Sequence, residues 1–272
     1  MSTATPTHPT TPAVAPGTEP TEAEVLHANR VIYNRKTLAE YDGNESIFSP
    51  QRQAEIDAVL AEIATSVPGP RFVDVGCGTG NLLRLAREHF AEVVGVDQAE
   101  KLLAQVKSAH PDWTVFACQS HHLPFDDASV DAVGMYALLH HLKDPEPTLL
   151  EAARVLAPGG VLYTDHDPNR AFWRIHGALR RLRSAGRRQS FGTDLEDMAE
   201  YHHCYSDGLD PQRLARTLRS HGFVEVDVRY RQTVNPNLRG VRGAVARMLR
   251  VAGGVMPAKS LFTHFQIVAR KG

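Results

Sequence analysis

The sequence predicts an α/β protein built on a mainly parallel β-sheet. Short β-branched runs alternate with longer segments whose apolar residues recur at helical spacing. Between the first strand, at 71–75, and the helix that follows it stand three alternating glycines, Gly76, Gly78 and Gly80. The next strand ends in Asp97, a carboxylate at the sheet edge where open α/β sheets bind ligands. Repeated strand–helix units of this kind form parallel sheets.

Length and composition limit the alternatives. A chain of 272 residues with 42% hydrophobic residues can form one elaborated domain, or one domain with a cap. No run of about 18 apolar residues occurs, so no membrane span is expected. Cys77, Cys118 and Cys204 are widely spaced and lack a C-x-x-C pattern, which argues against both a disulfide framework and a zinc site. We therefore expect a cytoplasmic protein.

The N-terminal region divides into two predicted parts. Residues 1–20 hold five prolines, six threonines and a single charge at Glu19, a composition typical of a disordered tail. Residues 21–66 are expected to form a helical lid. Apolar spacing predicts one helix over 21–41 and a second after Ser49-Pro50, which supply a cap and a first-turn proline. The buried stripe of the second helix is predicted to be Ile56, Val59, Leu60 and Ile63.

Residues 67–169 are predicted to form a ligand-binding core and 209–272 to complete the sheet domain. Strands are expected at 71–75, 92–97, 113–118, 129–136, 161–164, 223–230 and 261–269, and helices at 79–90, 99–109 and 210–222. The segment 170–208 exceeds an ordinary loop and is predicted to be a substrate cap.

The order Asp74-x-Gly76-x-Gly78-x-Gly80 favours binding of a nucleotide-type ligand, against the alternative of a tight turn that binds nothing. A dinucleotide fingerprint requires a small residue at position 81, where Asn81 stands. The motif resembles motif I of class I S-adenosylmethionine-dependent methyltransferases. The segments 117–127 and 137–142 are also similar to that family, and the sequence Arg-Val-Leu-Ala-Pro-Gly-Gly at 154–160 matches its R-V-L-x-P-G-G signature.

The resemblance implies a Rossmann-like sheet of seven strands in the order 3-2-1-4-5-7-6, the last strand antiparallel, with helices on both faces and a helical cap. It implies S-adenosylmethionine as cofactor, and Tyr33 and Tyr41 as lid contacts or packing aromatics. Gln119 stands where the family places an acidic residue against adenine, and an amide can make the same contacts. The cofactor-binding residues implied are Asp74, Gly76, Cys77, Gly78, Gly80, Asp97, Gln98, Gln119, Ser120 and Tyr136.

An oxygen or nitrogen acceptor needs a group to remove its proton, and histidine suits that task at neutral pH. By their positions after strands four and five, His141 and His166 are the predicted catalytic residues. Histidine pairs at 121/122, 140/141 and 202/203 permit a metal site. No carboxylate or cysteine spacing matches them, so no metal is predicted.

Acidic and basic residues are distributed unevenly along the chain. Residues 1–169 carry 11 Lys+Arg against 23 Asp+Glu, whereas 170–272 carry 19 against 8. Seven arginines between 170 and 188 accompany an apolar stripe of Phe172, Ile175, Leu179 and Leu182. This pattern predicts either an anionic or carrier-bound acceptor, or a solvated surface helix.

The predicted function is methylation of a small molecule at oxygen, nitrogen or carbon, in secondary or quinone-like metabolism. Two alternatives stay open: methylation of RNA or protein, and a module that binds S-adenosylmethionine without turnover. The basic segment lacks the interleaved aromatics that stack on bases, which argues against nucleic acid. The sequence predicts neither the identity of the acceptor nor the oligomeric state.

Overall fold

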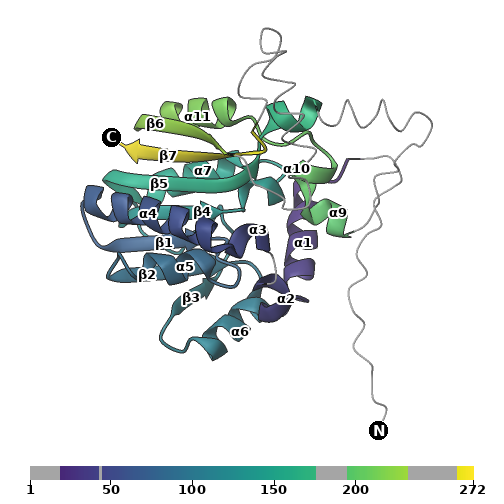
Figure 1. The fold of residues 1–272 in the computed structure, drawn as a ribbon, viewed down its shortest axis with the longest axis horizontal. Helices are drawn as coiled ribbons and strands as arrows, with labels where there is room; N and C mark the ends of the chain where they lie inside the picture. The colour runs from purple at the N-terminus through teal and green to yellow at the C-terminus, as the bar shows by residue number, and fades with distance from the viewer. Residues whose placement is uncertain (1–18, 43–44, 176–194, 232–261) are drawn as a thin grey trace, which may run out of the picture.

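The computed structural model describes residues 19–42, 45–175, 195–231 and 262–272. A seven-stranded sheet in the order β3-β2-β1-β4-β5-β7-β6 forms its centre (Figure 1). The strands are β1 (Arg71–Val75), β2 (Glu92–Asp97), β3 (Thr114–Ala117), β4 (Val130–Tyr136), β5 (Leu156–Pro168), β6 (Phe223–Arg231) and β7 (His264–Lys271). The first five strands pair in parallel, and β7 pairs antiparallel with both β5 and β6. The predicted strand order and the antiparallel last strand are confirmed.

Helices cover both faces of the sheet. On one face α4 (Pro50–Ser66), α5 (Asn81–Ala86) and α6 (Glu100–Ala109) contribute to one buried apolar cluster, and on the other α7 (Glu146–Val155) and α11 (Pro211–Ser220) contribute to a second (Figure 1). In α4 the Ser49 side chain caps the helix by accepting from the amide of Arg52. The predicted stripe of α4 is buried at all four positions. None of the helices in the described part of the chain combines the length and the apolar character that a membrane span requires.

The prediction of a single helix over 21–41 is wrong, because the chain forms two helices there, α1 (Glu22–Tyr33) and α2 (Leu38–Asp42). A capping box starts the second helix: the amide of Glu40 donates to Thr37 Oγ1, and the amide of Thr37 donates to Glu40 Oε2. A further short helix, α3 (Glu45–Phe48), precedes α4 and was not predicted.

Strand β5 begins earlier than predicted. Leu156 follows α7 directly and already pairs with Val130, so the helix ends four residues before the glycine pair. The register with β4 shifts between Val130 and Ala132, and Gly159 has φ +80°. Gly159 therefore lies at a bulged entry to the strand, beyond the end of the helix.

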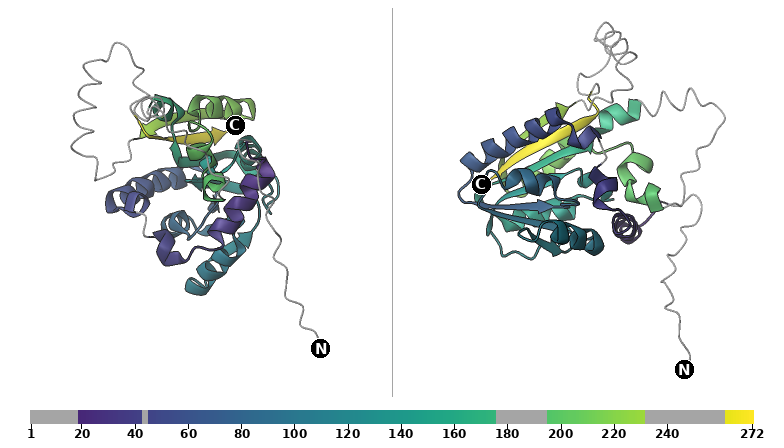
Figure 2. Two further views of the ribbon diagram at one scale, coloured as in Figure 1. Left: turned by 90° about the vertical axis from the view of Figure 1, so that its right-hand side faces the viewer. Right: turned by 60° about the horizontal axis from the view of Figure 1, so that its bottom comes forward.

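Helix α1 and three short elements lie at the carboxyl edge of the parallel strands. Helix α1 runs beside α9 (Leu195–Ala199), and α10 (Tyr201–Cys204) packs on the 3₁₀ turn η1 (Leu139–His141) that follows β4 (Figures 1 and 2). The side-chain amide of Asn29 in α1 donates to the carbonyl of His141 at 2.9 Å, which joins the N-terminal helix to the sheet edge.

The predicted division into tail, lid, core, cap and C-terminal part remains a prediction. Residues 1–18 of the predicted tail lie outside the described residues. So do positions 176–194 of the predicted cap, with Leu179, Leu182 and the arginines from 180 to 188.

The turn between β1 and α5 depends on glycine conformation and on space. Gly76, Gly78 and Gly80 have φ values of +72°, +52° and +89°. A Cβ at Gly80 would also lie 2.3 Å from the side chain of Trp113. Gly222, at the end of α11, shares the φ of +89° but has nothing within 4 Å of an added Cβ. Alanine at Gly222 would therefore cause backbone strain alone, whereas alanine at Gly80 would cause the same strain and a steric overlap.

We expect Gly80→Ala to destabilise the protein more than Gly222→Ala. Both substitutions incur the left-handed backbone cost of about 1–2 kcal/mol. Gly80→Ala adds the overlap with Trp113, for which overpacking costs about 1–3 kcal/mol. Urea unfolding of the two variants measures the difference. Equal losses would contradict the close packing of Trp113 against the turn.

Candidate functional site

A pocket lies at the carboxyl ends of β1, β2 and β4, with α1 on its outer side. It encloses about 610 Å³ of space between the surrounding atoms, part of which is open solvent. Its lining residues are Leu26, Asn29, Tyr33, Val75, Gly76, Gly78, Val96, Asp97, Gln98, Cys118, Ser120, Ala137, Leu138, His141 and Leu142.

The glycine turn forms one wall of the pocket with bare backbone. The amides of Gly76 and Cys77 both donate to the carbonyl of Val96, at 2.8 and 3.0 Å, which fixes the turn against the end of β2. A Cβ at Gly76 would lie 2.6 Å from the Leu138 side chain, so no side chain fits there. The turn can therefore bring peptide groups close to a ligand.

Asp97 closes the next side of the pocket. Its Oδ2 accepts from the amide of Gly78 at 3.0 Å and its Oδ1 accepts from the amide of Ala99 at 2.8 Å. Burial raises the pKa of Asp97, and these backbone donors and the nearby His141 oppose the rise. Each carboxylate oxygen retains acceptor capacity for a further donor, such as a hydroxyl of a ligand.

Asp74 lies beneath the turn, outside the pocket lining. It is almost completely buried, and its Oδ2 has no hydrogen-bond partner among the described residues. Burial, together with the negative charge of Asp97, raises the pKa of Asp74 to about 8, although the amide of Leu83 opposes the rise. Asp74 therefore carries a proton over much of the neutral range.

His141 is the predicted catalytic residue that faces the pocket. Its Nδ1 lies 2.6 Å from the carbonyl of Ala199, and since a carbonyl only accepts, Nδ1 carries the proton. Nε2 is then an acceptor, and it receives the hydroxyl of Tyr33 at 3.0 Å. Tyr33, one of the two predicted lid contacts, lines the pocket from α1. The side chain of Tyr41 lies outside the described residues.

His166 lies in a different environment, outside the pocket lining. Its ring stacks between Tyr136 and His264, with centroids 5.4 and 4.6 Å away. Burial, helped by the charge of Arg52, lowers the pKa of His166 to about 4. Its φ of +69° and that of Ala137, +54°, place strained backbone at the ends of β5 and β4.

Tyr136 belongs to a buried ion-pair network that the sequence did not reveal. Arg52 Nε donates to the Tyr136 hydroxyl at 3.2 Å, and the same guanidinium pairs with Asp165 at 2.6 Å. The hydroxyl of Tyr163 donates to Asp165 as well. Burial raises the pKa of Tyr136 to about 12, so the phenol stays protonated.

The predicted site residues therefore separate into two groups, and their roles remain predictions. Those that line the pocket are Gly76, Gly78, Asp97, Gln98, Ser120 and His141. Those that do not are Asp74, Cys77, Gly80, Gln119, Tyr136 and His166. Cys77 is buried in the apolar cluster beneath α4 and α5, and Gln119 is exposed.

Sequence reasoning missed most of the apolar lining. Leu26 and Asn29 come from α1, whose helical periodicity gave no indication of which face meets the sheet edge. Cys118 lies beside Gln119, so the neighbouring motif was the available signal. Ala137 and Leu138 belong to the quoted segment 137–142, which was used to identify the family and not to assign contacts.

A family model described as a methyltransferase domain matches residues 73–164. A methyltransferase of Mycobacterium tuberculosis is 39% identical over 92 residues, which cover 34% of this chain and 37% of that protein. The ubiquinone biosynthesis O-methyltransferase of Bordetella avium is 28% identical over 60% of this chain and 66% of its own. The 27-O-demethylrifamycin SV methyltransferase of Amycolatopsis mediterranei is 33% identical over 45% of this chain and 47% of its own. The chain thus spans between about a third and two thirds of these relatives.

Solved structures share the fold. A methyltransferase of Thermotoga maritima aligns with a TM-score of 0.56 at 19% identity, over 89% of this chain and 99% of that one. Phosphoethanolamine N-methyltransferase 2 of Haemonchus contortus, in complex with S-adenosyl-L-methionine, aligns with a TM-score of 0.57 at 18% identity, over 89% and 59%. The matched domain, the similar relatives, the glycine turn and the strand order together support a class I S-adenosylmethionine-dependent methyltransferase.

Proposed function

We propose that this protein transfers the methyl group of S-adenosylmethionine to a hydroxyl oxygen of a small molecule. One observation carries the proposal: the bare glycine turn, the Asp97 carboxylate and Nε2 of His141 all face a single pocket. The first two suit the donor, and the third suits removal of a proton from an acceptor. The two relatives named as O-methyltransferase and O-demethylrifamycin methyltransferase support an oxygen acceptor.

The residues present fit S-adenosylmethionine. Peptide groups at Gly76 and Gly78 border the pocket without side chains in the way, and Asp97 offers acceptors for a ribose diol. The unpartnered Oδ2 of Asp74, protonated near neutral pH, can donate to a group in the turn. When bound, the cofactor supplies a methyl group that its sulfonium already activates. NAD is not expected, because Asn81 stands where a pyrophosphate site requires a small residue.

The protein's own contribution is alignment and proton removal. The carbonyl of Ala199 holds the proton of His141 on Nδ1, which keeps Nε2 ready to accept one. The Tyr33 hydroxyl now donates to Nε2, so it can either yield to an acceptor hydroxyl or relay its proton. Leu26, Leu138 and Leu142 give this part of the pocket an apolar wall that limits water.

The partly covered pocket supports a small-molecule acceptor. Helix α1 lies across the carboxyl edge of the sheet and is joined to η1 through Asn29, a covered arrangement that suits a small molecule better than RNA or a protein surface. Mass spectrometry of metabolite pools incubated with the protein and methyl-labelled cofactor tests this. Label in a small-molecule ether is expected. Label found only in RNA or protein would contradict the acceptor class, and saturable binding without any labelled product would favour the non-catalytic module.

The donor site is tested by calorimetry with S-adenosylmethionine, S-adenosylhomocysteine and NAD. We expect binding of the first two and not of NAD. Asp97→Asn removes a charged acceptor and should weaken S-adenosylmethionine binding by about 1.5–3 kcal/mol. Asp126→Asn, at an exposed position away from the pocket, serves as the matched control and should leave affinity unchanged. An unchanged affinity in folded Asp97→Asn would contradict the ribose role.

The two predicted histidines should differ in their effect on turnover. His141→Gln removes the proton acceptor in the pocket and should lower kcat by at least about 100-fold, the low end for general base catalysis. His166→Gln changes a ring outside the pocket and should leave kcat within a few-fold of wild type. Steady-state kinetics with the identified acceptor measures both variants. A larger loss of kcat in His166→Gln than in His141→Gln would indicate that His166, near the end of β5, is the proton acceptor.

Asp74 should make stability depend on pH. Its pKa is about 8 in the folded protein against an ordinary value of 3.8, so folding favours the protonated form. The stability it contributes is complete below its ordinary pKa and is lost as pH rises towards about 8. The Asp74→Asn side chain stays neutral at every pH. The melting temperature of this variant minus that of wild type should therefore rise between about pH 5 and pH 8 and stay constant above that. A constant difference across this range would contradict the raised pKa.

A further inference from the structure

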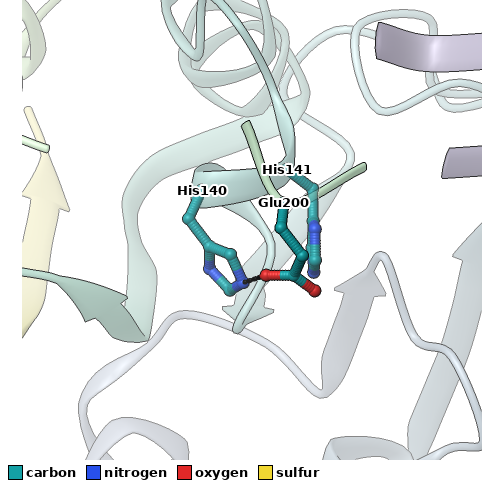
Figure 3. A group of neighbouring side chains, drawn as sticks. All are labelled: His140, His141 and Glu200. Carbon is teal, nitrogen blue, oxygen red and sulfur yellow. Dashed lines mark ion pairs between the residues drawn. The ribbon is translucent and has the colours of Figure 1, made fainter. Parts of the chain in front are cut away.

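Three side chains of the types that can bind a metal ion meet beside the pocket, where η1 packs against the start of α10. They are His140, His141 and Glu200, and one ligand atom from each lies within 4.8 Å of the others (Figure 3). Nε2 of His140 lies 3.8 Å from an oxygen of Glu200. Both histidines are buried, and the carboxylate comes from a segment some sixty residues further along the chain.

The hydrogen bonds of His140 leave its Nε2 without a proton. Nδ1 lies 2.9 Å from Asp167 Oδ1, and this same oxygen already accepts the backbone amide of His140 at 3.0 Å. Oδ1 is therefore an acceptor, and Nδ1 carries the proton. The Nε2 lone pair is thus directed towards a carboxylate.

His141 has the same arrangement. Its Nδ1 proton is donated to the carbonyl of Ala199, which leaves Nε2 as the ring nitrogen with a lone pair. The Tyr33 hydroxyl is the donor that now contacts this lone pair. Two imidazole lone pairs and one carboxylate therefore converge, and no proton lies between His140 and Glu200. A cation placed among them would be attracted by the carboxylate and by both lone pairs.

The chemistry of the three ligands selects the cation. Two imidazoles and one carboxylate are a ligand set of catalytic zinc sites, in which water or substrate takes the remaining position. Metal-bound histidines characteristically donate their other N–H to a carboxylate or a backbone carbonyl, as His140 does to Asp167 and His141 to Ala199. Mg²⁺ and Ca²⁺ prefer oxygen ligands, so the nitrogen pair favours a transition-metal ion.

We propose that His140, His141 and Glu200 bind one divalent transition-metal ion of the Zn²⁺ type. The side chain of Glu200 is 41% exposed, which gives the ion a route from solvent. Small movements of the three side chains bring the ligand atoms from their present spacing to coordination distance. The bound ion and the Tyr33 hydroxyl compete for the same lone pair of His141. If the proposed methyl transfer holds, occupancy also takes His141 out of proton removal, so the metal site would act as a brake.

The test uses the full chain without a histidine tag, cleared of metal by a chelator. Calorimetry with ZnCl₂ and elemental analysis after dialysis should give one ion per chain. Glu200→Gln keeps the size of the side chain and should weaken Zn²⁺ binding by at least about 10-fold. The double variant His121→Gln/His122→Gln removes another adjacent pair, whose rings lie 4.9 Å apart, and should bind Zn²⁺ as wild type does.

Two further readouts keep the test decisive. Co²⁺ in place of Zn²⁺ should give a visible ligand-field spectrum that Glu200→Gln alters, while circular dichroism reports that the variant is folded. Tyr33→Phe removes the competing donor and should tighten Zn²⁺ binding by up to roughly five-fold, the effect of one hydrogen bond. Absence of stoichiometric Zn²⁺ binding, or wild-type affinity in folded Glu200→Gln, would overturn the proposal.

The consequence for turnover is measured separately. The rate of methyl transfer should fall with Zn²⁺ over the concentration range in which calorimetry reports binding, and a chelator should restore it. A protein that binds Zn²⁺ but methylates nothing would contradict the proposed function and leave the metal site standing. A protein that methylates its acceptor but binds no Zn²⁺ would contradict the metal site and leave the proposed function standing.

Discussion

The attachment of the glycine turn to the end of β2 is the interaction on which the site depends. The carbonyl of Val96 accepts two amides of the turn, and Asp97 Oδ2 accepts a third, from Gly78. These bonds hold bare peptide groups beside a carboxylate at one edge of a parallel sheet. Glycine is needed there because the backbone has positive φ and because Leu138 fills the space that a side chain would take. The proposed donor, which has a ribose and a charged tail, would find its polar partners already placed there.

His141 joins the pocket to the elements that cover it. Its carbonyl accepts from Asn29 of α1, its Nδ1 donates to Ala199 at the end of α9, and its Nε2 accepts from Tyr33. One residue therefore fixes its own tautomer and at the same time holds two helices against the sheet edge. The same Nε2 lone pair can receive a proton or coordinate an ion, and this shared atom connects the proposed catalysis with the proposed metal site.

Sequence patterns predicted the sheet well because strands and glycine turns are local signals. The β-branched runs, the glycine spacing and Asp97 at a strand end located five parallel strands, and the family resemblance supplied their order. The helix over 21–41 was wrong because the capping box of Thr37 and Glu40 was not recognised. Contacts between distant segments carry no local signal. Arg52 and Asp165 pair across the fold, and Glu200 approaches His140 only after the chain has crossed the sheet. The prediction of no metal site used sequence spacing alone, and spacing does not show that Glu200 lies near His140.

The most direct measurement is a crystal structure of the protein with S-adenosylhomocysteine. The proposed donor site predicts the nucleoside in the pocket between the glycine turn and α1, with ribose hydroxyls on Asp97 and the sulfur on the side of His141. A ligand held elsewhere on the chain, or held in the pocket with its ribose away from Asp97 and its sulfur away from His141, would contradict the central claim.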